Sequence, residues 1–114
     1  KLLSHLEHDL IFSITSHLPH VISYALTESL FNSLNDKTFN FSGGSLEDYT
    51  RIASSDPTMW KDIFLSNNEN IINSINEFEK SLSRMKQLII NKDEKGLVEF
   101  LSKIKALRDN SIEK

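Results

Sequence analysis

Apolar residues recur at spacings of three and four along most of the chain, which is the period of an amphipathic α-helix. One such face runs from Leu3 to His17, and a second continues it from Val21 to Leu30. Pro19 lies between them, and a proline lacks a backbone N–H and clashes with the carbonyl four residues earlier. We therefore predict two helical stretches that meet at a kink or a restart at Pro19.

The remainder of the chain carries the capping signals of four further helices. Each signal is a side chain that can accept a hydrogen bond from the free backbone N–H groups of a first helical turn. The predicted starts are Ser45, Asp56 followed by Pro57, Ser66 or Asn67, and Asp93. Residues 35–45 have the composition of a loop. No segment alternates apolar and polar residues with a period of two, so we predict an all-α fold.

Composition limits the size of this fold and the ligands that it can hold. With 114 residues the chain is expected to form one compact domain with a single core. Its three glycines, Gly43, Gly44 and Gly96, do not have the spacing of a G-x-G-x-x-G turn or a P-loop, so the chain carries no nucleotide-binding loop of its own. Its 13 basic and 16 acidic side chains are interspersed and offer no basic stripe to nucleic acid.

The most apolar stretch of the chain, residues 10–30, is interrupted by His17, Pro19, His20 and Glu28, which favours a buried helix over a membrane span. The absence of cysteine is compatible with the cytoplasm. The chain begins without an initiator methionine or a signal peptide, as a piece cut from a longer protein would.

Four histidines in the first 20 residues are the first candidates for chemistry. They form two pairs, His5 with His8 and His17 with His20, and the i,i+3 spacing of each pair places both rings on one helical face. Neither pair has the H-E-x-x-H pattern or a cysteine nearby, so we predict no metal site. His17 and His20 lie in an otherwise apolar helix, where a polar ring needs a hydrogen-bond partner or a ligand.

Arg51 and Trp60 each allow a structural and a functional interpretation. Arg51 follows Asp48 by three residues, so the two side chains could form an intrahelical ion pair. Alternatively, the planar guanidinium could bind a substrate carboxylate. Trp60 could anchor the core or form the wall of an apolar pocket. Asp56 is predicted to cap a helix and not to act as a catalytic acid.

Several runs of residues carry a resemblance to a known family. They are His8-Asp9, Ser16-His17-Leu18-Pro19-His20, Gly43-Gly44, and the run from Asp48 to Ile63, which contains Thr-Arg-Ile-Ala and Ser-Asp-Pro-Thr-Met-Trp. In this order and spacing they resemble the C-terminal helical domain of prephenate dehydrogenases, enzymes of tyrosine biosynthesis. The matched motifs span residues 8–63, and the remainder fits the long closing helices of that family in pattern.

This resemblance implies a fold, an activity and a cofactor. The fold would be a helical substrate-binding and dimerisation domain like that of 6-phosphogluconate-dehydrogenase-type enzymes. The activity would be oxidative decarboxylation of prephenate to 4-hydroxyphenylpyruvate by a cytoplasmic homodimer that uses NAD or NADP. In this family a Rossmann domain that binds NAD comes first in the chain. That domain is absent from these 114 residues, so we expect the chain alone to be inactive.

Carried over residue by residue, the resemblance implies six substrate-binding residues and no catalytic residue in this chain. The six are Ser16, His17, His20, Asp48, Arg51 and Trp60. Arg51 would bind a carboxylate of prephenate, with Asp48 orienting it. Ser16 and His20 would line the pocket and hydrogen-bond the substrate, and His17 would be a second polar contact. The tryptophan would shape the wall.

Other functions remain as alternatives. A non-enzymatic all-helical interaction module would leave the histidines without a chemical role. A helical chorismate mutase would need several basic residues around a dicarboxylate, and this chain has few arginines. Within the dehydrogenase family, arogenate, the amino analogue of prephenate, is the alternative substrate.

Overall fold

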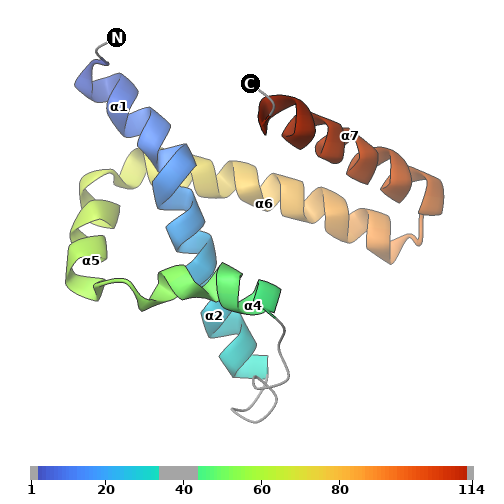
Figure 1. Ribbon diagram of the computed structural model, residues 1–114, viewed down its shortest axis with the longest axis horizontal. Helices are drawn as coiled ribbons and strands as arrows, with labels where there is room; N and C mark the ends of the chain where they lie inside the picture. Colours follow the sequence, from blue (N-terminus) through green and yellow to red (C-terminus); the bar gives the residue numbers. More distant parts are fainter. Residues whose placement is uncertain (1–2, 34–43, 113–114) are drawn as a thin grey trace. The chain divides into compact units, whose positions relative to one another are not determined.

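The computed structural model describes residues 3–33 and 44–112, and nearly all of them lie in helices (Figure 1). The elements in chain order are α1 (His5–Phe12), the π-helical turn η1 (Ser13–His17), α2 (Leu18–Ser33), α4 (Gly44–Thr50), the 3₁₀ turn η2 (Arg51–Ser54), α5 (Pro57–Ser66), α6 (Asn68–Ile90) and α7 (Glu94–Ile112). The described residues contain no strand, which confirms the all-α prediction. None of the helices in this part of the chain is long and apolar enough to cross a membrane.

Most of the predicted loop at 35–45 lies outside the described residues. Helix α4 begins at Gly44, one residue before the predicted cap at Ser45. The start of α5 is as predicted, because Asp56 accepts a hydrogen bond from the backbone N–H of Thr58 at 3.0 Å and Pro57 occupies the first turn. The start of α6 at Asn68 also agrees with the prediction of a restart at Ser66 or Asn67.

The chain divides into two compact units, residues 1–75 and residues 76–114, whereas its length predicted one compact domain. The large apolar side chains that are buried, Trp60 and Ile71, both belong to the first unit. The described residues of the second unit include no buried side chain, because two helices alone cannot enclose a side chain on all sides. The buried core is therefore confined to the first unit.

The first unit is organised around a continuous rod formed by α1, η1 and α2 (Figure 1). Its N-terminus has a capping box, in which the Ser4 hydroxyl accepts the backbone N–H of Glu7 and the Glu7 carboxylate accepts that of Ser4, each at 3.1 Å. The rod does not break at Pro19. Instead it widens one turn earlier, where the N–H of Leu18 bonds to the carbonyl of Ser13, five residues back. A π-helical turn relieves the clash that a proline ring causes in a tighter helix.

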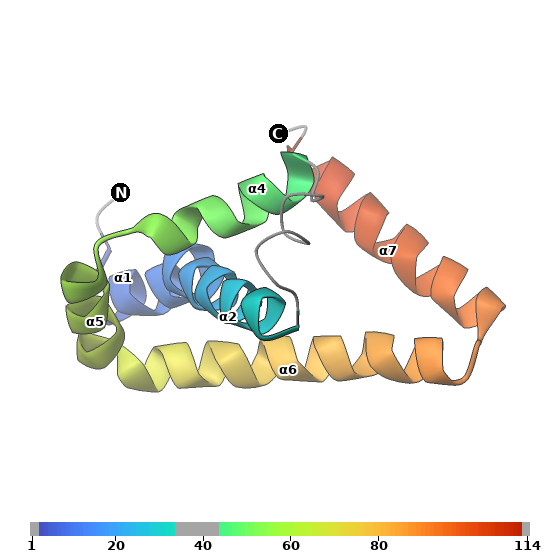
Figure 2. The same cartoon turned by 90° about the horizontal axis from the view of Figure 1, so that it is seen from below.

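Three other elements surround this rod: α4, α5 and the first turns of α6 (Figure 2). The hydroxyl of Ser23 donates to the carbonyl of Tyr49 at 2.8 Å and joins α2 to α4. The hydroxyl of Tyr24 donates to the carbonyl of Ser55 at 3.2 Å. The fully buried Ser13 lies 3.4 Å, oxygen to oxygen, from the hydroxyl of Ser74 on α6. Hydroxyl side chains thus join the rod to the elements around it.

The second unit is an antiparallel hairpin of α6 and α7 (Figure 1). At the end of α6 the N–H groups of Lys92 and Asp93 bond to the carbonyls of Ile89 and Leu88, and Lys92 has a positive φ of 50°. These bonds form a Schellman turn, the common ending of an α-helix. Asp93 then accepts the N–H of Gly96 at 2.9 Å and caps α7, as the sequence predicts.

Candidate functional site

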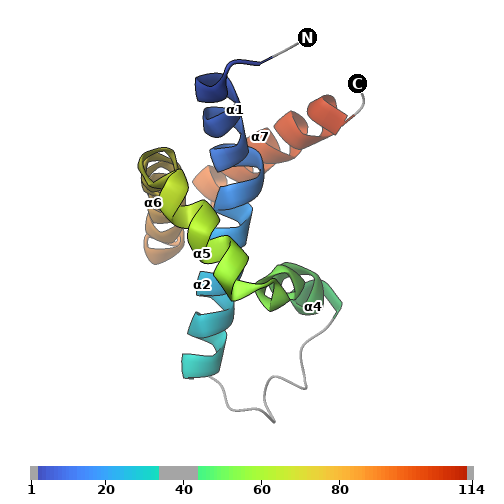
Figure 3. The same ribbon diagram turned by 90° about the vertical axis from the view of Figure 1, so that its left-hand side faces the viewer.

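The candidate site is centred on Trp60 of α5, a helix that crosses the rod (Figure 3). Its indole contacts His17 at the end of η1 and His20 near the start of α2. The ring of His20 stacks on Trp60, with the ring centroids 3.6 Å apart and the planes inclined by 18°. The ring of His17 meets the same indole edge-on, at 6.0 Å and 80°. Trp60 itself is only 8% exposed. The structure therefore brings together the two longest motifs of the sequence, in which His20 and Trp60 lie 40 residues apart.

The hydrogen bond of His20 determines which of its ring nitrogens carries a proton. Its Nδ1 lies 2.8 Å from the backbone carbonyl oxygen of Ser16. A carbonyl oxygen can only accept, so Nδ1 must donate and carry a proton. In the neutral ring Nε2 is then the acceptor, and it has no hydrogen-bond partner among the described residues. A ligand could occupy that position.

His17 has a different partner, Asn67, which the sequence analysis treated only as a helix start. The side-chain nitrogen of Asn67 lies 3.3 Å from Nδ1 of His17 and 2.8 Å from the carbonyl oxygen of Asp9. Asn67 is buried at the junction of α5 and α6. Burial lowers the pKa of His17 below its ordinary value, and the neighbouring His20 lowers it further. The signal available in the sequence was an asparagine between two predicted helices, which does not by itself indicate a contact with His17.

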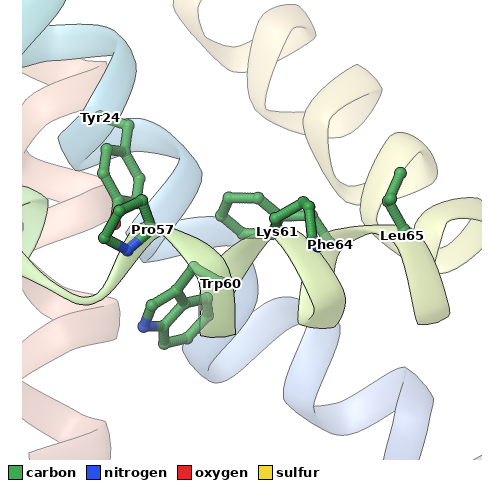
Figure 4. Close-up of a pocket in the computed structure, with 6 residues that line it drawn as sticks. All are labelled: Tyr24, Pro57, Trp60, Lys61, Phe64 and Leu65. Carbon is green, nitrogen blue, oxygen red and sulfur yellow. The ribbon is translucent and has the colours of Figure 1, made fainter.

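Trp60 also lines an apolar pocket between α2 and α5 (Figure 4). The pocket has a volume of about 360 Å³ and is lined by Tyr24, Pro57, Trp60, Lys61, Phe64 and Leu65. Phe64 supports the indole at a centroid distance of 5.5 Å. The same ring is therefore buried in the core and forms a wall of this apolar pocket, which none of the other five predicted substrate-binding residues lines.

Asp48 and Arg51 lie on the segment that packs against α2. Asp48 lines a smaller cavity of about 230 Å³ together with Pro19, Tyr49 and Ile52, which places it beside the histidine motif. Arg51 is exposed at the start of η2. Among the described residues, no ion pair joins it to Asp48, and its guanidinium has no hydrogen-bond partner there. The intrahelical ion pair considered from the sequence is thus not formed, and Arg51 is available to a ligand.

The histidines do not assemble a metal site within the described ranges. No group of three or more His, Asp or Glu side chains converges there. Nδ1 of His17 and of His20 are each occupied by a hydrogen bond inside the protein. The ring of His8 lies 4.3 Å from that of Phe12, between centroids and with the planes inclined by 35°, and its Nδ1 lies 3.5 Å from the carboxylate of Asp9.

Comparison with known families agrees with the motifs. The family described as the dimerization domain of prephenate dehydrogenase matches residues 4–103. The chain belongs to this family. The resemblance inferred from the sequence motifs is thereby confirmed, and the match extends beyond them through α6 and into the first half of α7.

Relatives from several organisms match most of this chain. It is 32% identical to the prephenate dehydrogenase of Bacillus subtilis over 90% of this chain and 28% of that protein. It is 32% identical to the cyclohexadienyl dehydrogenase of Zymomonas mobilis over 95% of this chain and 38% of that protein. The chain therefore spans well under half the length of these relatives.

Solved structures share its fold. The prephenate dehydrogenase of Aquifex aeolicus, solved in complex with hydroxyphenyl propionate and NAD+, has a TM-score of 0.86 and 44% identity over 95% of this chain and 38% of that chain. The arogenate dehydrogenase of Synechocystis, at 21% identity, has the same TM-score over 96% of this chain and 41% of that chain, and it supports the fold alone.

Proposed function

We propose that this chain is the substrate-binding and dimerisation part of an NAD-dependent prephenate dehydrogenase, which converts prephenate to 4-hydroxyphenylpyruvate and carbon dioxide. The observation that carries the proposal is the stack of His20 on Trp60, with Nδ1 of His20 held by the Ser16 carbonyl. This stack joins two motifs of the prephenate dehydrogenase family. It also leaves Nε2 of His20 free beside the indole of Trp60.

The residues of this site suit a substrate with two carboxylates and a ring hydroxyl. Arg51 would bind one carboxylate through its planar, charged fork, and Asp48 would orient that guanidinium once substrate is present. Ser16, His17 and His20 would make hydrogen bonds to the polar groups. Trp60 would fix the position of the substrate as the pocket wall. Such fixation matters because a displacement of about 1 Å can slow an oriented reaction about a hundredfold.

The described residues do not fit a dinucleotide by themselves. NAD+ accepts the hydride in this class of reaction, and its pyrophosphate needs a strand, a glycine-rich turn and a helix N-terminus. The described residues contain no strand, and the glycines of the sequence lack the required spacing. We therefore assign the cofactor, NAD+ in preference to NADP+, to a separate nucleotide-binding domain N-terminal to this one. The chain alone is expected to be inactive.

The intact enzyme is expected to reduce NAD+ when prephenate is added, with release of carbon dioxide. NADH absorbance measures the rate, and parallel reactions with arogenate and with NADP+ compare the kcat/KM values. We expect prephenate with NAD+ to give the highest value. An intact enzyme that oxidises neither prephenate nor arogenate would favour the non-enzymatic interaction module instead.

We further propose that the enzyme is a homodimer and that the hairpin of the second unit contributes to its interface. The helices of this hairpin carry large apolar side chains that are about half exposed. These are Leu82, Ile89, Ile90, Val98, Leu101, Ile104 and Leu107. Many exposed apolar side chains on one pair of helices support an interaction site there in a protein that is stable in water.

A charge placed among these exposed apolar side chains should dissociate the dimer. Leu101→Asp, at a position that is 50% exposed, is expected to shift the intact enzyme toward monomer in sedimentation velocity experiments, because a buried unpaired carboxylate opposes association. Lys103→Asp, on the same helix outside the apolar set, serves as the control and should leave the dimer intact. A wild-type enzyme that sediments as a monomer at micromolar concentration would contradict the homodimer.

A further inference from the structure

The orientation of the Asn67 side chain follows from its neighbours. The Asp9 carbonyl oxygen can only accept a hydrogen bond, so the amide atom 2.8 Å from it must be the nitrogen. The oxygen of the same amide accepts from the side-chain nitrogen of Asn70 at 2.9 Å. All polar atoms of the Asn67 side chain are therefore committed, and a flipped amide would place two oxygens against each other at Asp9.

This orientation also determines the proton position on His17. The amide nitrogen of Asn67 has two hydrogens, of which one points to Asp9 and the other is available to Nδ1 of His17, 3.3 Å away. A donor facing Nδ1 requires that Nδ1 be unprotonated. The proton of the neutral His17 ring must then lie on Nε2. In His20, by contrast, the proton lies on Nδ1, because the Ser16 carbonyl accepts from it.

We propose that Asn67 is a positioning residue that holds neutral His17 as the Nε2–H tautomer, opposite to that of His20, so that the pair offers one donor and one acceptor nitrogen to the substrate. The identity of the substrate in this statement rests on the proposed function. The tautomers follow from hydrogen bonds inside the protein and do not depend on that identity.

A histidine held in this way donates from Nε2 in both protonation states. The neutral ring carries its single proton there, and the protonated ring carries one on each nitrogen. The charged and titratable groups that influence His17 are Asp9, which favours its protonation, and His8 and His20, which oppose it. Asn67 adds a neutral donor that favours the unprotonated Nδ1. An anionic group of the substrate would therefore meet a donor at His17 across the whole working pH range.

Asn67→Asp reverses this arrangement while keeping the size of the side chain. The new carboxylate accepts a hydrogen bond from a protonated Nδ1 of His17, which raises the pKa of His17 and leaves Nε2 of the neutral ring without a proton. It also removes the hydrogen bond that Asn67 donates to the Asp9 carbonyl. Asn68→Asp is the matched control, because it adds the same charge one residue later, at an exposed position. Both variants are to be made in the intact enzyme labelled with 15N-histidine, together with His17→Gln to assign the His17 signals.

Long-range 1H–15N spectra of the wild-type enzyme are expected to show His17 protonated at Nε2 and His20 protonated at Nδ1. Asn67→Asp should move the His17 proton to Nδ1 and raise its titration midpoint, and Asn68→Asp should do neither. A wild-type His17 protonated at Nδ1 would overturn the proposal, and this measurement needs no variant to fold. A His17 protonated at Nδ1 would not affect the assignment as a dehydrogenase, because the assay with prephenate tests that assignment separately.

Kinetics provide the second readout. The KM for prephenate is to be measured in Asn67→Asp and in the wild type across a range of pH, and the ratio of the two KM values should rise by about tenfold as the pH increases. The rise is expected because His17 of the variant loses its proton, and the lone pair of its Nε2 then faces an anion. A purely structural role would lower kcat/KM by the same factor at every pH. A ratio that does not vary with pH would therefore contradict the positioning role.

Discussion

Replacing Arg51 with alanine in the intact enzyme is expected to raise the KM for prephenate by about ten- to one-hundredfold while leaving the KM for NAD+ nearly unchanged. The guanidinium is exposed and has no partner among the described residues, so it loses little when a substrate carboxylate binds it. A hydrogen bond to a charged group contributes about 1.5–3 kcal/mol, which corresponds to that range in affinity. Steady-state kinetics with each substrate varied in turn measures the effect.

Two further variants separate the role of the guanidinium from a general loss of charge. Arg51→Lys keeps the positive charge but not the two-pronged geometry, and it should recover only part of the affinity. Arg84→Ala removes an arginine whose guanidinium donates to Ser81 on α6, and it should leave the KM for prephenate unchanged. Because Arg51 is exposed, the thermal unfolding midpoint of Arg51→Ala should match the wild type. An unchanged KM for prephenate would remove Arg51 from the site.

Trp60→Ala should have the largest effect on stability. The indole is 8% exposed, and it contacts His20 and Phe64 at centroid distances of 3.6 and 5.5 Å. Truncation of a buried tryptophan costs about 3–5 kcal/mol, because it removes buried apolar surface and leaves a cavity. Hydrogen exchange of peptides from α2 and α5 in the intact enzyme should accelerate by about two to four powers of ten.

The controls for this variant lie at the same position and next to it. Trp60→Phe keeps an aromatic face against His20 and should give a smaller acceleration of exchange. Met59→Ala changes a neighbour on α5 that is 50% exposed, and it should leave exchange in α2 unchanged. If α2 and α5 stayed as protected in Trp60→Ala as in the wild type, Trp60 would not be the residue that holds these two helices together.

The helices and most of their boundaries could be predicted from the sequence because their signals are local. The cap at Asp56, the proline after it and the cap at Asp93 act on backbone groups within three residues. The irregularity at Pro19 was also predicted, but the structure places it one turn earlier, in η1. A helix can absorb a proline by widening the preceding turn, and the residue pattern alone does not show which accommodation is adopted.

Several of the residues predicted for the site lie together in the structure, but their contacts with one another could not be predicted from the sequence. Ser16, His17, His20 and Trp60 were singled out from their residue types and motif, and the structure brings them together. The ion pair between Asp48 and Arg51 was equally compatible with their spacing, but it does not form among the described residues. An i,i+3 spacing permits such a pair, but an exposed ion pair adds too little to the free energy of unfolding to make it form.

The sequence by itself determined the helical period and the caps, because each of these depends on residues a few positions apart, and its motifs supplied the residues proposed for the site. Only the tertiary structure decided that Trp60 is both core and pocket wall, and which nitrogen of each histidine carries the proton. The His17 proton depends on Asn67, which is 50 residues from His17 and 58 residues from Asp9 in the chain. Local patterns carry no information about contacts at that separation, and these become defined only when α5 and α6 pack against the rod.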